Sequence, residues 1–206
     1  MKIQRLDRVV NFKSTIPGQL STGGSGQFSS GVDNQDIPDL NNEDRIAFIL
    51  LGGSTLKDWV YNHYLRELHR PEVHIYDRDT DNPPKYRSAC DEVNRRTDGS
   101  IAILTSKREM ENYIHPYAIK EALGIDVTFG DTDNVPVMVA QAVHQSEPSS
   151  KPWVELSEEK KKEKERKAKR RLNTDAVKVM TIERLNQIDP HGDVIGWFIE
   201  IANRIA

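Results

Sequence analysis

Three aspartates, Asp77, Asp79 and Asp81, follow a short apolar run at every second position. Carboxylate oxygens at this spacing can share one hard cation, and such sites suit Mg²⁺ or Mn²⁺ held together with water and a substrate phosphate. Without a cation or a basic group, the like charges of Asp77 and Asp79 would repel each other. The alternative is a solvated turn before Asn82-Pro83-Pro84, because Asp and Pro are ordinary turn residues. This segment alone leaves both interpretations open.

Charged residues also follow the next apolar run, in the segment 105–113. Glu109 or Glu111 can complete a metal site, and Lys107 or Arg108 can hold a phosphate or stabilise the charge that develops during phosphoryl transfer. A glutamate in the first turn of a helix also stabilises the helix dipole, which is the alternative explanation of Glu109 and Glu111. Complementary groups at two strand ends favour a shared site.

The elements that would position these residues alternate regularly along the chain. Apolar runs predict strands at 46–51, 73–76, 100–104 and 125–129, with helices at 54–68, 85–96, 108–123 and 135–143. Strand–helix units at this spacing predict an α/β fold with a mostly parallel sheet and helices on both faces. Open sheets of this kind bind ligands at the carboxyl ends of their strands, where the acidic residues fall.

Three regions follow from this pattern. Residues 1–44 form an irregular segment, 45–145 an α/β domain, and 146–206 a helical extension. The extension begins with a charged helix and continues with helices near 174–180, 181–188 and 193–205, the last with an apolar stripe at helical spacing.

The order of these motifs resembles the Toprim domain of OLD-family endonucleases and of their relatives in bacterial anti-phage systems. Those proteins usually pair an ABC-type ATPase with a carboxyl-terminal Toprim nuclease. The resemblance covers about residues 46–120 and rests on Asp77-x-Asp79 and on Glu109-Met110-Glu111-Asn112-Tyr113, with weaker support from the glycine turn 52–53.

The resemblance implies a Toprim/Rossmann-like fold, a Mg²⁺ or Mn²⁺ cofactor and a DNA substrate, with RNA as a second candidate. Carried over by position, Asp77 and Asp79 would be catalytic metal ligands and Lys107 would face phosphate. Glu111, with Glu109 as second choice, would be the acidic group of the following motif. Together with Asp81, which the spacing of the aspartates adds, the predicted metal ligands are Asp77, Asp79, Asp81, Glu109 and Glu111.

One departure from the Toprim pattern concerns its first glutamate, which normally follows an apolar strand and precedes a glycine. The run 46–51 ends in Gly52-Gly53 instead, and no Glu-Gly pair follows an apolar run upstream of Asp77. Either the motif is degenerate or a partner chain supplies the glutamate.

Three functional hypotheses follow. The first is a metal-dependent nuclease that cleaves DNA in anti-phage defence with an ABC-type ATPase. That ATPase would be another polypeptide, because no phosphate-binding P-loop sequence occurs here. The second is a non-catalytic Toprim-like subunit that binds the ATPase. The third is a phosphatase or primase-like transferase with the same acidic edge.

A strongly basic run occupies residues 160–171, with nine Lys or Arg and two Glu. Contacts between such a run and phosphates would add salt-dependent affinity for nucleic acid. The alternative is a solvated helix face with ion pairs four residues apart. The predicted nucleic-acid contacts are Arg108, Lys160, Lys161, Lys164, Lys167, Arg170 and Arg171.

The composition of the chain limits the classes of protein to which it can belong. The 206 residues can bury a core, and the single cysteine, Cys90, excludes an internal disulfide and a cysteine zinc site. A reducing, cytoplasmic compartment is expected. No apolar run approaches the roughly 18 residues needed to cross a bilayer, so no membrane association is expected, and homo-oligomerisation stays open. His74 lies inside a predicted strand, where a packed, hydrogen-bonded histidine is expected.

Overall fold

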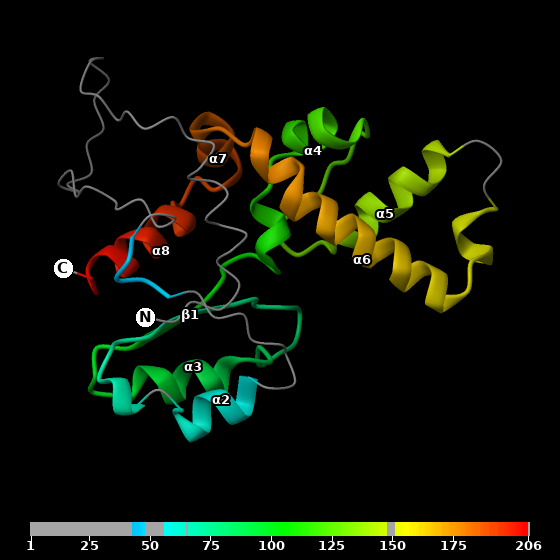
Figure 1. Cartoon of the computed structure of the whole chain (residues 1–206). Coiled ribbons are helices and arrows are strands. Elements are labelled where there is room, and N and C mark those ends of the chain that lie inside the picture. Colours follow the sequence, from blue (N-terminus) through cyan, green and yellow to red (C-terminus); the bar gives the residue numbers. More distant parts are fainter. Residues whose placement is uncertain (1–42, 48–55, 65, 148–150, 206) are drawn as a thin grey trace, which may run out of the picture.

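The computed structural model describes residues 43–47, 56–64, 66–147 and 151–205 (Figure 1). The predicted irregular segment 1–44 and the glycine turn lie almost wholly outside these residues, as does most of the predicted strand 46–51. Within the described ranges, no helix is long and apolar enough to cross a membrane. The elements are α2 (Leu56–Asn62), η1 (Arg66–Leu68), β1 (Val73–Tyr76), α3 (Arg87–Asn94), β2 (Ile101–Leu104), η2 (Met110–Tyr113), α4 (Pro116–Leu123), α5 (Val135–Ser146), η3 (Trp153–Glu155), α6 (Glu158–Thr174), η4 (Ala176–Val179), α7 (Ile182–Ile188) and α8 (Asp193–Ala202).

The described strands form a small parallel sheet. β1 pairs with β2 in a register that places Val73 opposite Ile101 and Tyr76 opposite Leu104. Helices α2 and α3 lie on one side of the sheet and α8 lies on the other (Figure 1). The prediction of parallel strands with helices on both faces is confirmed for these elements.

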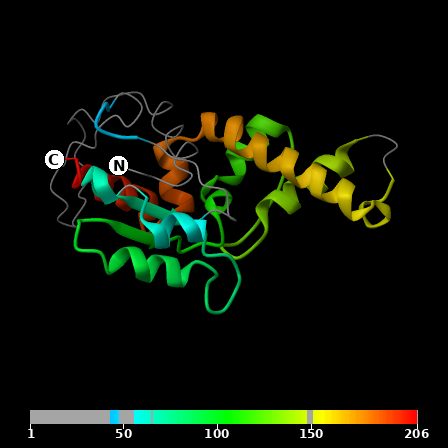
Figure 2. The same cartoon turned by 60° about the horizontal axis from the view of Figure 1, so that its bottom comes forward.

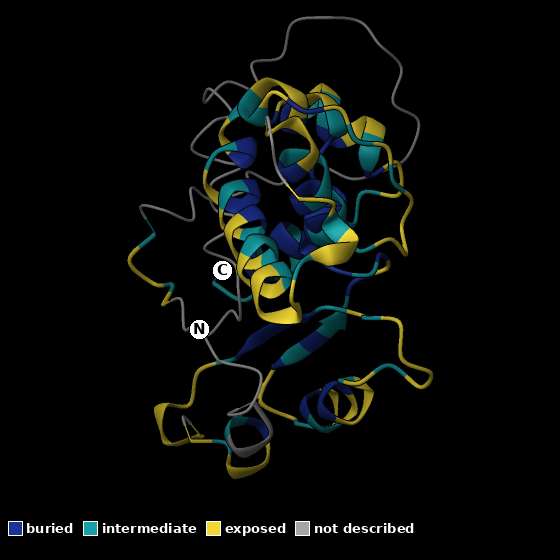
Figure 3. Ribbon diagram, turned by 90° about the vertical axis from the view of Figure 1, so that its right-hand side faces the viewer, coloured by how far each residue is buried: buried dark blue, intermediate teal, exposed yellow. Residues whose placement is uncertain are grey.

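Alternation along β1 divides the interior into two apolar clusters. Val73 and Ile75 join the larger cluster, which continues through the helices from η2 to α8. Tyr76 joins the smaller cluster, formed with α2, α3 and β2. Side chains of successive strand residues point to opposite faces, so this four-residue strand contributes to both. Figure 3 shows buried residues on the sheet and on the inner faces of the helices.

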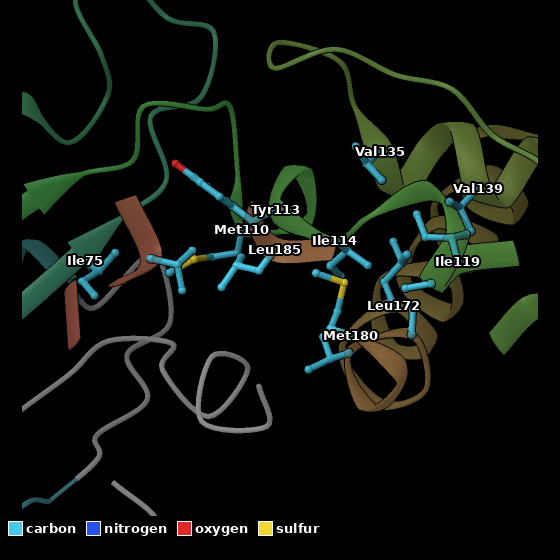
Figure 4. Close-up of a cluster of buried hydrophobic side chains, with 14 of the residues drawn as sticks. Ile75, Met110, Tyr113, Ile114, Ile119, Val135, Val139, Leu172, Met180 and Leu185 are labelled. Atoms are coloured by element: carbon cyan, nitrogen blue, oxygen red, sulfur yellow. The ribbon is translucent and has the colours of Figure 1, made fainter. Parts of the chain in front are cut away.

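The larger cluster joins the sheet to the carboxyl-terminal helices. Its most buried side chains include Tyr113, Ile119, Leu172 and Leu185, each at most 2% exposed. Figure 4 shows these side chains as a continuous row, from the sheet to the packed helices. Helices α5 and α6 lie side by side and project from the rest of the molecule (Figure 2). The helix α6 is therefore anchored in the same core as β1.

Two predicted elements are wrong. The helix predicted at 108–123 is broken, because η2 ends at Tyr113 and α4 starts afresh at Pro116. The side chain of His115 caps α4 by accepting a hydrogen bond from the Tyr117 amide at 3.1 Å. Proline is favoured at the first helical position, because its missing N–H has no helical partner there.

The strand predicted at 125–129 is not formed, although these residues are described. Ile125 is buried, and Val127 and Phe129 pack against the larger cluster. The strand-like alternation of the segment thus reflects packing on this cluster and not pairing with another strand. Gly130, which follows it, accepts a hydrogen bond from the Asn112 side chain through its carbonyl.

Candidate acidic site

The loops that follow β1 and β2 are joined by hydrogen bonds. The Thr105 amide donates to the Tyr76 carbonyl at 2.9 Å, and the Arg78 amide donates to Thr105 Oγ1 at 2.9 Å. The Asp79 amide donates to the Arg108 carbonyl at 2.8 Å. Residues that are distant in sequence are therefore held at the same edge of the sheet, as the parallel arrangement predicts.

Asp77 lies against the turn that carries the two glutamates. Its Oδ1 accepts a hydrogen bond from the Met110 amide at 3.1 Å. Glu109 caps η2 in a reciprocal capping box with Asn112, whose Oδ1 accepts from the Glu109 amide at 3.3 Å. This cap holds Glu109 and Glu111 on a tight turn beside Asp77. We call Asp77, Glu109 and Glu111 the acidic cluster.

A lysine from the basic helix reaches this cluster. The Nζ of Lys169 lies 2.6 Å from Oε2 of Glu109 and 3.3 Å from Oε2 of Glu111. One turn along α6, Asn173 donates from Nδ2 to Oε1 of Glu111 at 2.8 Å. Residues four apart on a helix share one face, so α6 presents an ammonium and an amide together.

The electrostatics of the cluster follow from burial and crowding. Burial, together with the charges of Glu111 and Asp77, raises the pKa of Glu109 to about 7, although Lys169 opposes the rise. Burial alone would lower the pKa of Lys169, but the charges of Glu111, Glu109 and Asp77 outweigh it and raise that pKa. Three carboxylates and one ammonium would leave two negative charges in excess if all were ionised. The cluster therefore attracts further positive charge.

Asp79 and Asp81 lie in the loop after β1. The strand ends at Tyr76, and Asp79 has a left-handed backbone with φ of 54°. The chain thus leaves the strand direction, and the alternation that would align Asp79 with Asp77 does not continue. Asp79 is half-buried and Asp81 is exposed. Within the described residues, Lys169 forms its ion pairs with Glu109 and Glu111 of the acidic cluster, and not with Asp79 or Asp81.

The predicted phosphate-binding residues Lys107 and Arg108 lie in the loop after β2. Lys107 is buried, pairs with Oδ1 of Asp131 at 2.5 Å and lies over the Tyr113 ring. Arg108 is half-buried and donates to the Thr132 carbonyl at 3.3 Å. Asp131 therefore already neutralises the ammonium of Lys107.

The oxygen donors of the acidic cluster suit a hard divalent cation in chemistry and charge. Among the described residues, however, no three His, Cys, Asp or Glu side chains form a ready-made set of metal ligands. Lys169 supplies the positive charge nearest to the glutamates. A metal at this position would have to share these oxygens with the ammonium or move it.

Sequence reasoning did not single out Lys169 and Asn173. Of the basic residues that it did select, Lys161 pairs with Glu158 at 2.8 Å, Lys164 with Glu147 at 3.3 Å and Arg171 with Asp175 at 3.5 Å. Lys160, Lys167 and Arg170 are exposed. A weak signal for Asn173 was available, because an asparagine next to Leu172 ends a run of charged residues.

A separate buried network lies on β1. His74 Nε2 lies 2.7 Å from Glu72 Oε2, and the Tyr76 hydroxyl lies 2.7 Å from His74 Nδ1. Arg96 donates to the same Glu72 oxygen at 2.9 Å and to the Val60 carbonyl at 2.6 Å. The prediction that His74 is packed and hydrogen-bonded is confirmed.

Comparisons with known proteins give no relative: no family model, no curated protein and no solved structure matches the chain.

Proposed function

We propose that the chain is a metal-dependent nuclease, or the nuclease subunit of a larger assembly, that cleaves phosphodiester bonds of DNA. The observation that carries this proposal is the meeting of Asp77, Glu109 and Glu111 at one edge of a parallel sheet, beside a lysine of a strongly basic helix. Carboxylates can hold Mg²⁺ or Mn²⁺. The basic surface of α6 can attract the phosphate backbone.

In this proposal Asp77, Glu109 and Glu111 hold the metal. When bound, the metal would activate water and neutralise charge on the reacting phosphate. The ammonium of Lys169 stabilises charge in the same region, and Asn173 fixes the orientation of the Glu111 carboxylate. Glu109, whose pKa is raised to about 7 by burial and by the neighbouring carboxylates, would bind the metal in its ionised form.

The resemblance to OLD-family Toprim domains supports an anti-phage role with a separately encoded ABC-type ATPase as partner. A second candidate, the non-catalytic Toprim-like subunit, is favoured by a specific observation: Lys169 already forms ion pairs with both glutamates. In that case the acidic cluster would be a structural ion-pair network, and the chain would bind the ATPase without cleaving DNA.

Nicking of supercoiled plasmid by the purified full chain tests the proposal. We expect Mn²⁺-dependent nicking that Asp77→Asn and Glu111→Gln reduce at least 100-fold. The matched control is Asp126→Asn, since Asp126 is an exposed carboxylate paired with Lys120 at 2.8 Å, outside the acidic cluster. Binding of Mn²⁺ measured by calorimetry should weaken in the same two variants.

Nicking that survives Asp77→Asn unchanged would refute the assignment of the site. An inactive chain that binds no Mn²⁺, yet purifies in a stable complex with an ATPase, would establish the non-catalytic alternative.

A further inference from the structure

A groove between α5 and α6 lies on a different face of the basic helix from Lys169. It encloses about 310 Å³, at the lower end of the range of small-molecule sites. Its apolar lining consists of Leu123 at the end of α4, of Val139, Ala140 and Val143 in α5, and of Ala168 in α6. Val139 and Ala140 are buried, whereas Val143 and Leu123 are half-buried. The groove therefore has an aliphatic floor that is partly open to solvent.

Cations of α6 form one rim of this groove. Lys160, Lys164, Lys167 and Arg171 line it, and their spacing of four, three and four residues keeps them on one face of the helix. These residues span about 16 Å of helix at 1.5 Å per residue. The rim is therefore a row of cations beside the aliphatic floor.

Carboxylates balance only part of this charge. Glu147 and Glu163 also line the groove, which leaves two positive charges in excess. Glu147 pairs with Lys164 at 3.3 Å. Within the described part of the chain, Lys160 and Lys167 have no ion-pair partner. Two of the four rim cations are thus available to an anion.

The chemistry of the lining defines the ligand. The described residues that line the groove carry aliphatic or charged side chains and no hydroxyl, amide or aromatic ring. The arginine, lysines and glutamates of this lining could contact base edges, but these residues include no aromatic ring on which successive bases could stack. The aliphatic side chains and the lysine stems can bury a hydrocarbon body. The ammonium groups can pair with one anionic group.

We propose that the groove between α5 and α6 binds an amphipathic anion with an aliphatic body, of the class of medium-chain carboxylates. The hydrocarbon lies on the half-buried Leu123 and Val143 of the floor. The carboxylate lies at Lys167 on the rim, next to Arg171, which also pairs with Asp175 at 3.5 Å. This site is separate from the acidic cluster and does not depend on nuclease activity.

Calorimetry on the full chain, with monomeric decanoate as the probe, tests the proposal. We expect saturable binding of one decanoate per chain. Decanol lacks the charge, decyltrimethylammonium reverses it and butyrate lacks the long chain, so each should bind at least tenfold more weakly.

Variants locate the site. The double variant Lys167→Gln/Arg171→Gln should weaken decanoate binding about tenfold. Val143→Asn should also weaken it, because it places a polar amide in the aliphatic floor. The matched control is Lys162→Gln/Arg166→Gln, which removes two exposed cations of the same helix outside the groove and should change affinity less than twofold. Circular dichroism verifies that each variant is folded.

Other outcomes would overturn the proposal. One is the absence of saturable decanoate binding, and another is an equal loss of decanoate affinity in the two double variants. A third is that the chain binds phosphatidylglycerol vesicles but does not bind monomeric decanoate. A single-stranded oligonucleotide that requires Lys167 and Arg171 while decanoate fails to bind would make the rim a nucleic-acid track. These binding measurements do not require nuclease activity, so they test the groove even if the chain does not nick plasmid DNA.

Discussion

The ammonium of Lys169 lies 2.6 Å from a carboxylate oxygen of Glu109, although 60 positions separate the two residues. This contact joins the charged helix α6 to the turn after β2. Loss of this contact would leave buried carboxylates without their cation, because Glu109 is 8% exposed and Glu111 is fully buried. A buried charge that loses its partner costs more than the intact pair contributes.

Replacement of the lysine should therefore destabilise the fold. We expect Lys169→Ala to lower the free energy of unfolding by about 2–3 kcal/mol, below the range for fully buried pairs because the Lys169 side chain is 23% exposed. Urea titration measures the change. Mn²⁺ should restore much of the loss if the carboxylates hold metal. Arg170→Ala, an exposed change on the same helix, should stay within about 0.5 kcal/mol of the parent.

Asn173 makes a smaller contribution to the same site. Asn173→Ala removes the donor to Glu111 Oε1, so we expect a loss of about 1–3 kcal/mol in urea titration. Thr174→Ala, next along the chain and exposed, is the comparison. Equal stabilities of the two variants would contradict the role assigned to Asn173.

The ion pair of Glu72 and Arg96 predicts a dependence of stability on pH. Burial opposes ionisation of Glu72, but the hydrogen bond and charge of His74 and the charge of Arg96 outweigh it and lower its pKa to about 2. Since the ordinary pKa is 4.5, the contribution of Glu72 to stability is complete above pH 4.5 and is lost as the pH falls towards 2. Urea titrations across this window measure the loss.

Arg96 tests the origin of that effect. Arg96→Gln removes the arginine that pairs with the buried Glu72 carboxylate, while His74 still contacts it. We therefore expect a loss of about 3 kcal/mol at pH 7, at the lower end of the range for an unpaired buried charge. The loss should shrink at acidic pH as Glu72 becomes protonated in the variant. Arg95→Gln removes the adjacent exposed arginine and serves as control. A loss that does not vary between pH 7 and pH 3 would contradict the assignment.

The hydrogen bonds of His74 predict its tautomer. Its Nε2 faces the Glu72 carboxylate, which can only accept, so neutral His74 carries its proton on Nε2 and accepts from the Tyr76 hydroxyl at Nδ1. Nitrogen NMR shifts of the ring report this directly. Tyr76→Phe removes the donor to Nδ1 and should cost about 1 kcal/mol. Tyr86→Phe, on the ring that packs against Tyr76, is the control.

The sequence was most informative where local periodicity decides structure. Strands β1 and β2 and helix α3 were predicted because short apolar runs alternate with an amphipathic segment. The break before Pro116 was missed, although a proline at a helix start is a local signal. The extended segment 125–129 could not be distinguished from a strand, because its alternation reflects packing on helices that are distant in sequence.

The candidate site was predictable only in part for a similar reason. Asp77, Glu109 and Glu111 follow strands, so the parallel sheet brings them to one edge, where the capping box of Glu109 sets the turn beside Asp77. Lys169 is one of nine basic residues in the run 160–171. Which of them turns inward depends on how α6 docks against the core, and this is set by Leu172, Ala168 and their distant partners.

The geometry of α6 connects the two sites that we propose on its opposite faces. Lys169 and Arg171 are two positions apart and so point about 160° apart around one helix axis. Any rigid-body displacement of α6 therefore changes the setting of both side chains together. A ligand of the groove that favours one position of the helix would alter the affinity of the acidic cluster for a cation. By reciprocity, the cation would alter the affinity of the groove by the same factor.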